Sequence, residues 1–312
     1  MHIPDGLLST PVAVAGEVGG IGLIGYAAYW VKTQLSQRRV VLMAVLGALI
    51  FALQMLNFPV AGGTSGHFGG GALAGIALGF WPATLVLSAV LGIQALVFSD
   101  GGVLAFGMNV INMGVIAPAF ALLLYRGALR ISDSRGSRVA GAFAGAFAGV
   151  VASSAAVAFE LWVSGRANFG VALVSMVGWH ALIGIGEGLI TGALVGYLAA
   201  VRPDLLGDKK DGVSTSMNAV YIVLGVLAVI GAGISWLASS HPDGLEFVLE
   251  SKGISFPEFS LLGNGTWFAD YGVRGLGDSP IGTVLAGIVG LVLVGALLWV
   301  LFASKKRERA KS

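Results

Sequence analysis

The chain has no cysteine among its 312 residues, and only 11% of its residues are charged. Soluble domains carry about 25% charged residues, so a soluble globular fold would lack the polar surface it needs. The absence of cysteine excludes a disulfide-stapled secreted module. A hydrophobic fraction of 56% excludes intrinsic disorder, and the sparse charge excludes a nucleic-acid-binding surface.

Sequence signatures of several common chemistries are missing as well. There is no G-x-x-x-x-G-K-[ST] string, so we do not expect the chain itself to hydrolyse ATP. There is no H-E-x-x-H and no serine elbow. The first ten residues, MHIPDGLLST, lack the basic stretch and the cleavage site of a signal peptide. Long apolar runs dominate instead, and they predict an all-α, polytopic integral membrane bundle.

Glycine is abundant, at 49 residues. This share is about twice the usual ~7%. Several glycines recur at every fourth position of apolar runs, a spacing that lets helix backbones approach closely. The three files are Gly71, Gly75 and Gly79; Gly141, Gly145 and Gly149; and Gly188, Gly192 and Gly196. We expect these files to serve helix packing rather than chemistry.

Apolar runs and basic residues together predict about nine membrane spans. Seven runs are clear, and the region 60–98, which Trp81 and Pro82 interrupt, is interpreted as a hairpin of two spans. The clear runs are 11–31, 40–57, 103–125, 139–163, 171–200, 219–239 and 281–303. With nine spans and an outside N-terminus, all basic residues except Arg166, Lys252 and Arg274 face the cytoplasm. The C-terminus then lies inside, and a single span at 60–98 gives a poorer charge split.

A shift in composition divides the chain into two predicted domains. Residues 1–201 form the first membrane domain, and the polar stretch 202–218 is a cytoplasmic linker. Residues 219–312 form a two-span domain with a polar outer loop at 240–280 and a basic tail. The location implied is the inner or plasma membrane of a prokaryotic cell, crossed many times.

The first two residues, Met1 and His2, could form a metal chelate. If Met1 keeps a free amine, the amine and the amide nitrogen of His2 close a five-membered ring on a metal. The same amide nitrogen and Nδ1 of His2 close a six-membered ring. Three nitrogens then lie in one plane and leave one corner for another imidazole. Four planar nitrogens suit Ni(II) or Cu(II) better than Zn(II).

His67 is the candidate for the fourth corner. It lies in NFPVAGGTSGHFGGG, an outer loop on the same side as Met1 and His2. The surrounding glycines would let an N-terminal strand dock against bare backbone. Pro4 and Gly6 are expected to turn the chain after the chelate. From the residues alone, a loop histidine beside a disordered start is the competing interpretation.

Four strings resemble the CbiM/NikM family, the substrate-binding membrane subunits of energy-coupling-factor transporters for cobalt or nickel. They are MHIPDG at the start, QMLNFPVAGGTSGHFGGG at 54–71, QALVFSDGGVLAFGMNVINMG at 94–114 and HALIGIGEGLITG at 180–192. The resemblance covers about residues 1–200 and implies Met1, His2 and His67 as metal ligands. It also implies a transmembrane coupling (T) subunit and cytoplasmic ATPase subunits as partners. The divalent metal is then the transported substrate, not a cofactor, and the chain is not an enzyme.

The second domain resembles the PDGLE domain, which is related to the small CbiN/NikN partner subunit. The resemblance rests on HPDGLEFVLE at 241–250 and FADY at 268–271. It implies that this partner is fused here, and we expect it to help load metal or hold the assembly. Its one histidine, His241, is expected to be an exposed loop residue. Nickel and cobalt are not distinguished by the sequence.

Ionisable residues within the apolar spans leave alternatives open. Glu17, Glu160 and Glu187 are acidic, and His180 lies two helical turns from Glu187, on the same face. These groups are expected to join helices or to brace the metal loop. The near-membrane amides Asn57, Asn109 and Asn112 are expected to be capping or bracing groups. The alternatives are an intramembrane metalloenzyme that uses His180 and Glu187, or a non-catalytic membrane assembly subunit.

Overall fold

The computed structural model describes residues 1–206, 216–257, 266–276 and 279–303. Within this part of the chain, eight helical segments are long and apolar enough to cross a membrane. They are α1 (Thr10–Gln34), α2 (Gln37–Gln54), α4 (Phe80–Ile93) with a π-helical extension (Gln94–Phe98), α5 (Phe106–Asn109) continued through a π-helical segment (Val110–Ile116) into α6 (Ala117–Ile131), α7 (Arg135–Val163), α8 (Phe169–Val201), α9 (Met217–Ile234) with one 3-10 turn (Ser235–Leu237), and α11 (Pro280–Ala303). The prediction of an all-α, multi-pass membrane bundle is confirmed.

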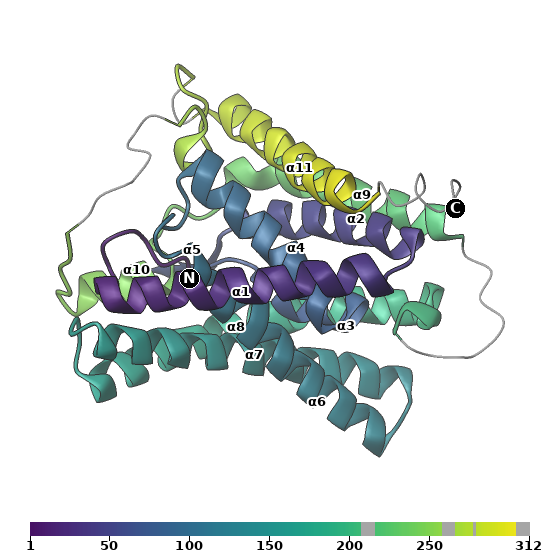
Figure 1. Ribbon diagram of the computed structural model, residues 1–312, viewed down its shortest axis with the longest axis horizontal. Helices are drawn as coiled ribbons and strands as arrows, with labels where there is room; N and C mark the ends of the chain where they lie inside the picture. Colours follow the sequence, from purple (N-terminus) through teal and green to yellow (C-terminus); the bar gives the residue numbers. More distant parts are fainter. Residues whose placement is uncertain (207–215, 258–265, 277–278, 304–312) are drawn as a thin grey trace.

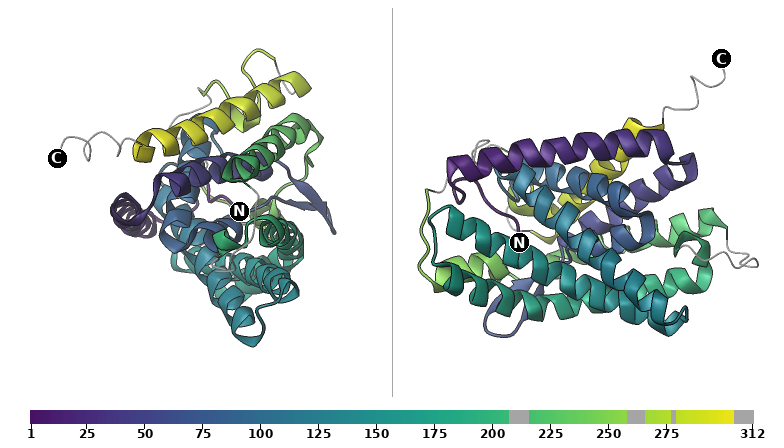
Figure 2. Two further views of the ribbon diagram at one scale, coloured as in Figure 1. Left: turned by 90° about the vertical axis from the view of Figure 1, so that its right-hand side faces the viewer. Right: turned by 60° about the horizontal axis from the view of Figure 1, so that its bottom comes forward.

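The helices form two groups with the N-terminus between them (Figures 1 and 2). In one group α7 packs between α6 and α8. In the other, α9 and α11 pack against each other and against α2, while α4 touches α1, α2 and α11. Large apolar side chains such as Val18, Val174 and Val300 are more than two-thirds exposed, as expected for surfaces that face lipid.

The file of Gly141, Gly145 and Gly149 brings two helix backbones together, as predicted. A Cβ on Gly145 would lie 2.7 Å from the carbonyl oxygen of Ala121, and one on Gly149 would lie 2.9 Å from that of Ala117. Both contacts join α7 to α6. Separations this short leave no room for a methyl group, so glycine at these positions sets the distance between the two helices.

The region 60–98 differs from the predicted hairpin of two helical spans. A two-stranded hairpin, β1 (Phe58–Val60) and β2 (Thr64–Gly66), leads into α3 (Gly71–Leu78) and then α4. With eight residues, α3 is about 12 Å long, too short to cross a membrane alone. Gly79 turns the chain between α3 and α4 with φ 93°, a conformation that favours glycine. A ninth long helix is therefore not found among the described residues, and the orientation of the termini stays a prediction.

The segment between α9 and α11 folds back toward the N-terminus. Its helix α10 (Gly244–Ser251) packs on α8 and on β2, at the end of the bundle where α1 begins (Figure 1). Residues 207–215 of the predicted linker, 258–265 of the predicted loop and the basic tail from 304 lie outside the described residues. The predicted domain boundaries stay predictions, and we call residues 219–312 the C-terminal region.

Candidate metal centre

The N-terminal segment is fixed inside the bundle by hydrogen bonds. Ile3 is fully buried and donates its N–H to Oδ1 of Asn109 over 2.8 Å. Its carbonyl accepts from Nδ2 of Asn109 over 3.1 Å and from the N–H of Gly102 over 2.8 Å. Asp5 accepts the N–H of Leu104 over 2.8 Å. The start of the chain is thus a folded element, and the predicted bracing role of Asn109 is confirmed.

The turn that follows is where the sequence predicted it. Gly6 has φ 86°, in the left-handed region that favours glycine. Arg166 donates Nε to the carbonyl of Leu7 and Nη2 to that of Gly6, each over 2.8 Å. The guanidinium therefore holds the turn, and Leu7 and Leu8 are buried just beyond it.

The loop that carries His67 is held in place by the side chain of Glu187 on α8. The carboxylate accepts the N–H of Gly69 over 2.6 Å and that of Gly70 over 2.9 Å. Buried backbone N–H groups need such internal partners because water does not reach them. Glu187 is therefore a brace for this loop, one of the roles expected from the sequence.

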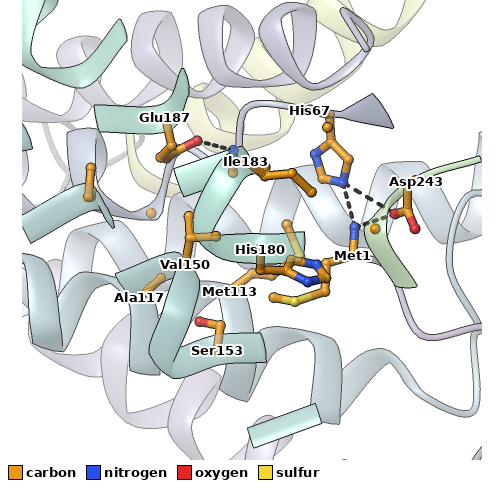
Figure 3. A pocket seen from close by; sticks show the side chains of 16 residues that line it. Met1, His67, Met113, Ala117, Val150, Ser153, His180, Ile183, Glu187 and Asp243 are labelled. Atoms are coloured by element: carbon orange, nitrogen blue, oxygen red, sulfur yellow. Dashed lines mark hydrogen bonds and ion pairs between the residues drawn. The ribbon is translucent and has the colours of Figure 1, made fainter. Parts of the chain in front are cut away.

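The N-terminal amine and His67 meet. The nitrogen of Met1 lies 2.6 Å from Nε2 of His67 (Figure 3). On the other edge of the ring, Nδ1 faces the carbonyl oxygen of Phe68 at 3.3 Å, so Nδ1 carries the proton. Nε2 then has its lone pair directed at the amine. Two predicted ligand atoms, 66 residues apart in the sequence, are thus brought together.

His2 lies at the same place with a different arrangement from the predicted one. Its ring stacks on that of His67, with centroids 5.0 Å apart and an interplanar angle of 8°. Its Nδ1 lies 3.0 Å from Oδ1 of Asp100, not at the amine. Its Nε2 is buried and has no hydrogen-bond partner among the described residues. The His2 ring is therefore close to the Met1 amine and to His67, but its Nδ1 is directed at Asp100.

Asp243 of the C-terminal region completes this cluster, and the sequence reasoning missed it. Its Oδ2 lies 2.5 Å from the nitrogen of Met1 and 3.8 Å from Nε2 of His67 (Figure 3). The same residue is the N-cap of α10, where Oδ1 accepts the N–H groups of Leu245 and Glu246. The string HPDGLE contained the signal, since its aspartate precedes an apolar helix, but nothing local showed where that helix packs.

The C-terminal region is attached to the His67 hairpin by backbone pairing. The N–H of Ser65 donates to the carbonyl of Pro242 over 2.8 Å, and its hydroxyl donates to that of His241 over 2.8 Å. Asp243 forms an isolated parallel bridge with Ser65. His241 itself is exposed, as predicted. This pairing explains how a residue 242 positions after Met1 reaches its amine.

Burial and charge fix the protonation of the cluster. Burial, followed by the N-terminal ammonium and His2, lowers the pKa of His67 to about 3, so its imidazole is neutral at pH 7. Burial alone would raise the pKa of Asp243, but the N-terminal ammonium and His67 outweigh it and hold that pKa well below its usual range. The site therefore combines a carboxylate, an ammonium and a neutral imidazole.

A cavity of about 40 Å³ lies against the cluster and reaches Glu187 (Figure 3). This volume holds a few water molecules. His180 lines it, with Nδ1 2.8 Å from the carbonyl of Met176 and Nε2 without a hydrogen-bond partner in the described part of the chain. Gly244 is packed against this ring, since a Cβ there would lie 2.8 Å from Cε1. His180 and Glu187 thus share one face, as predicted, while Glu187 is occupied by backbone N–H groups.

The other acidic groups join helices. Oε1 of Glu17 accepts the N–H of Gly107 over 2.8 Å, and Oε2 of Glu160 accepts Nδ2 of Asn112 over 3.1 Å. Across the described residues, no three His, Cys, Asp or Glu side chains are grouped as a metal site. A metal held by the Met1–His67 cluster would therefore need backbone nitrogen atoms as ligands.

Comparison with known families gives two matches. Residues 2–205 match the family described as the cobalt uptake substrate-specific transmembrane region, CbiM. Residues 218–307 match the PDGLE domain.

Individual relatives agree over most of the chain. A protein of Archaeoglobus fulgidus, named as a candidate fused nickel transport protein NikMN, is 37% identical, over 95% of this chain and 96% of its own length. The fused nickel transport protein NikMN of Rhodobacter capsulatus is 30% identical, over 95% of both chains. A crystal structure of a truncated transition metal transporter matches with a TM-score of 0.58 and 34% identity, covering 64% of this chain and 99% of that one. The relatives are transport proteins and not enzymes, and this chain belongs to the CbiM family, with a PDGLE domain fused at its C-terminal end.

Proposed function

We propose that this chain is the substrate-capture membrane subunit of an importer for a divalent transition metal, nickel or cobalt. The proposed ligands are the amine of Met1, the amide nitrogen and Nδ1 of His2, and Nε2 of His67. The observation that carries the proposal is the 2.6 Å separation between the Met1 nitrogen and His67 Nε2. Neighbouring corners of a square plane lie about 2.8 Å apart when each metal–nitrogen bond is about 2 Å.

The protonation of the cluster supports metal exchange at this point. His67 Nε2 already presents a lone pair to the amine, and a metal ion would replace the proton that lies between the two nitrogens. Asp243 then accepts an N–H of the coordinated amine, and its negative charge offsets part of the charge of the metal. The C-terminal region would thus hold the metal centre without supplying a ligand of its own.

Four nitrogens in a plane, one of them a deprotonated amide, favour low-spin Ni(II) over Co(II). The family match names cobalt, whereas the fused relatives from Archaeoglobus fulgidus and Rhodobacter capsulatus are named for nickel. Nickel is therefore the substrate that the ligand set favours, and cobalt is the alternative to be compared directly.

Energy for uptake would come from partner chains. The sequence has no phosphate-binding P-loop string, so ATP hydrolysis is assigned to cytoplasmic ATPase subunits acting through a transmembrane coupling subunit. The proposed metal centre lies at the end of the bundle where α1 begins, the end that the distribution of basic residues assigns to the outside. Capture from the external medium follows from this placement.

Metal titration of the detergent-purified full chain tests the proposal. Ni(II) and Co(II) are titrated against the chain with a free amine, verified by intact mass, and against the same chain acetylated at its amine. His241→Gln is the control because this exposed histidine has no place in the proposed site. We expect one metal per chain, lost on acetylation and retained in His241→Gln. Equal binding by the acetylated chain would contradict the proposed ligand set.

A further inference from the structure

One atom of His2 has two partners that exclude each other. In the structure, Nδ1 lies 3.0 Å from Oδ1 of Asp100. A six-membered chelate ring with the His2 amide requires this same Nδ1 as a metal ligand. Nε2 cannot replace it without enlarging the ring. If His2 binds metal as proposed above, its contact with Asp100 therefore has to change.

Asp100 is fixed by a residue of the C-terminal region. The hydroxyl of Tyr271 donates to Oδ2 of Asp100 over 2.5 Å and accepts Nε2 of Gln94 over 2.9 Å. Its ring stacks on Phe98, with centroids 5.0 Å apart and an interplanar angle of 22°. Burial and the neighbouring Asp100 raise the pKa of Tyr271 well above its usual range, so the hydroxyl keeps its proton. The second oxygen of Asp100 is thereby left for His2.

The backbone is strained to place this hydroxyl. Asp270 and Tyr271 have φ of 51° and 59°, in the left-handed region, which aspartate tolerates better than most residues and tyrosine rarely adopts. Two consecutive residues of this kind persist only where surrounding contacts compensate the strain, and such positions concentrate at functional sites. The contact of Tyr271 with Asp100 is the contact that this conformation makes possible.

Half a turn of the imidazole resolves the conflict at His2. Rotation about the Cβ–Cγ bond moves Nδ1 to the place of Cδ2 and Nε2 to the place of Cε1. Nε2 then lies beside the corner that Asp100 now faces, and Nδ1 lies on the opposite edge. In the present orientation Nε2 is buried without a partner among the described residues. The half turn alone sets Cδ2 opposite Oδ1 of Asp100, so a further tilt of the ring as the chelate closes is needed to bring Nε2–H to that carboxylate, which then supplies the missing acceptor. Histidines that bind metals commonly donate their other ring N–H to a carboxylate.

We propose that Asp100, held by Tyr271, is the positioning residue for His2, accepting Nδ1–H in the metal-free chain and Nε2–H once the turned ring binds metal through Nδ1. This inference rests on the proposed function, because it takes His2 as a ligand. The Nδ1 proton leaves to water and Nε2 takes one from water, so the number of protons on the ring is unchanged. The C-terminal region then controls both halves of the chelate, the Met1 amine through Asp243 and the His2 ring through Tyr271 and Asp100.

Nitrogen NMR of the full chain, labelled with 15N-histidine, tests the exchange directly. The chain has four histidines, so His180→Gln and His241→Gln suffice to reduce the signals to His2 and His67. Low-spin planar Ni(II) is diamagnetic and leaves these signals observable. We expect His2 to carry its proton on Nδ1 before Ni(II) is added and on Nε2 afterwards. A Ni(II)-loaded chain with the proton still on Nδ1 overturns the inference.

Three variants separate positioning from general folding. Asp100→Asn removes the charge, and Tyr271→Phe removes the hydroxyl that holds Asp100. Thr266→Val is the matched control because it removes a hydroxyl that bonds to Ser99 over 2.8 Å and does not reach His2. We expect Asp100→Asn to bind Ni(II) about 10–100-fold more weakly than wild type. Tyr271→Phe should lower the affinity for Ni(II) by less, and Thr266→Val should leave it unchanged.

The outcomes also separate this inference from the proposed function. Suppose that Ni(II) changes the 15N chemical shift of Nδ1 of His2, while the Asp100 and Tyr271 variants bind Ni(II) and relocate the His2 proton as wild type does. The ligand set then stands and the positioning role is wrong. If the His2 nitrogens do not respond to bound Ni(II), both are wrong. Loss of affinity in Asp100→Asn together with incomplete transfer of the proton to Nε2 supports the positioning role.

Discussion

The amine of Met1 lies 2.6 Å from Nε2 of His67, and Oδ2 of Asp243 lies 2.5 Å from the same amine. The N-terminal amine is therefore held inside the bundle, at the site that we propose binds metal. A hairpin, a buried N-terminal segment and the PDGLE segment each supply one member of this cluster.

Replacement of Asp243 separates its charge from its capping role. Asparagine is as good an N-cap as aspartate, so Asp243→Asn keeps the start of α10 and loses the carboxylate beside the amine. We expect about 10–100-fold weaker Ni(II) binding. The metal-free chain should also lose stability, because the buried ammonium of Met1 loses its ion-pair partner. Asp243→Ala should lose about 1 kcal/mol of stability in addition, because the cap is also removed.

Competition of Ni(II) with a coloured chelator, together with thermal unfolding in detergent, measures both effects. Glu246→Gln serves as the control, since the side chain of Glu246 bonds to the N–H of Asp243 and does not touch the amine. Wild-type affinity in Asp243→Asn would show that the carboxylate contributes nothing to the metal centre.

Replacement of Glu187 should loosen the loop that carries His67. A glutamine has one acceptor oxygen, so Glu187→Gln satisfies one of the N–H groups of Gly69 and Gly70 and opposes the other with its own donors. We expect a loss of about 1–3 kcal/mol in stability and weaker Ni(II) binding. Glu160→Gln is the control, a buried acid that bonds to Asn112 away from this loop. Equal effects of the two variants on Ni(II) affinity would remove the specific role of Glu187.

Much of the fold was predictable from the sequence, because apolar runs alone determine which segments cross a membrane. At the start of the chain, the turn at Gly6 and the meeting of the amine with His67 were predictable. The contact of His2 Nδ1 with Asp100 was not predictable, and the chelate stays a proposal. The short helix α3 could not be predicted, because a glycine-rich stretch is compatible both with a helix and with irregular backbone supported by Glu187. The contacts of Asp243 and Tyr271 could not be predicted either, because they depend on packing between segments more than 170 residues apart.

Acid should destabilise the metal-free chain through His67. The pKa of His67 is about 3 in the folded chain, against 6.5 for an exposed histidine, so between these values the unfolded chain binds more protons. The stability associated with the neutral imidazole is complete above pH 6.5 and is lost as the pH falls toward 3. Thermal unfolding of metal-free wild type and His67→Gln at pH 7 and pH 4 measures this. Wild type should lose more stability on acidification, and identical losses would contradict the lowered pKa.

Orientation in the membrane follows from the basic residues and is open to direct labelling. The chain has no cysteine, so Ser132→Cys and Ser255→Cys, both at exposed positions, each give one reactive thiol. An impermeant thiol reagent should label position 255 in intact cells and position 132 only in inverted vesicles. Labelling of both positions from one side of the membrane would refute the predicted topology.

The effect of His67→Ala on Ni(II) affinity, measured with and without one alanine inserted between Met1 and His2, tests the chelate most directly. In wild type, His67→Ala removes the fourth nitrogen and should weaken binding at least about 10-fold. The insertion adds a second backbone amide before the imidazole, so the N-terminal segment can fill all four planar positions itself. His67→Ala should then have no effect. A loss of equal size in both backgrounds, or no loss in wild type, would show that the N-terminus and His67 do not share a metal.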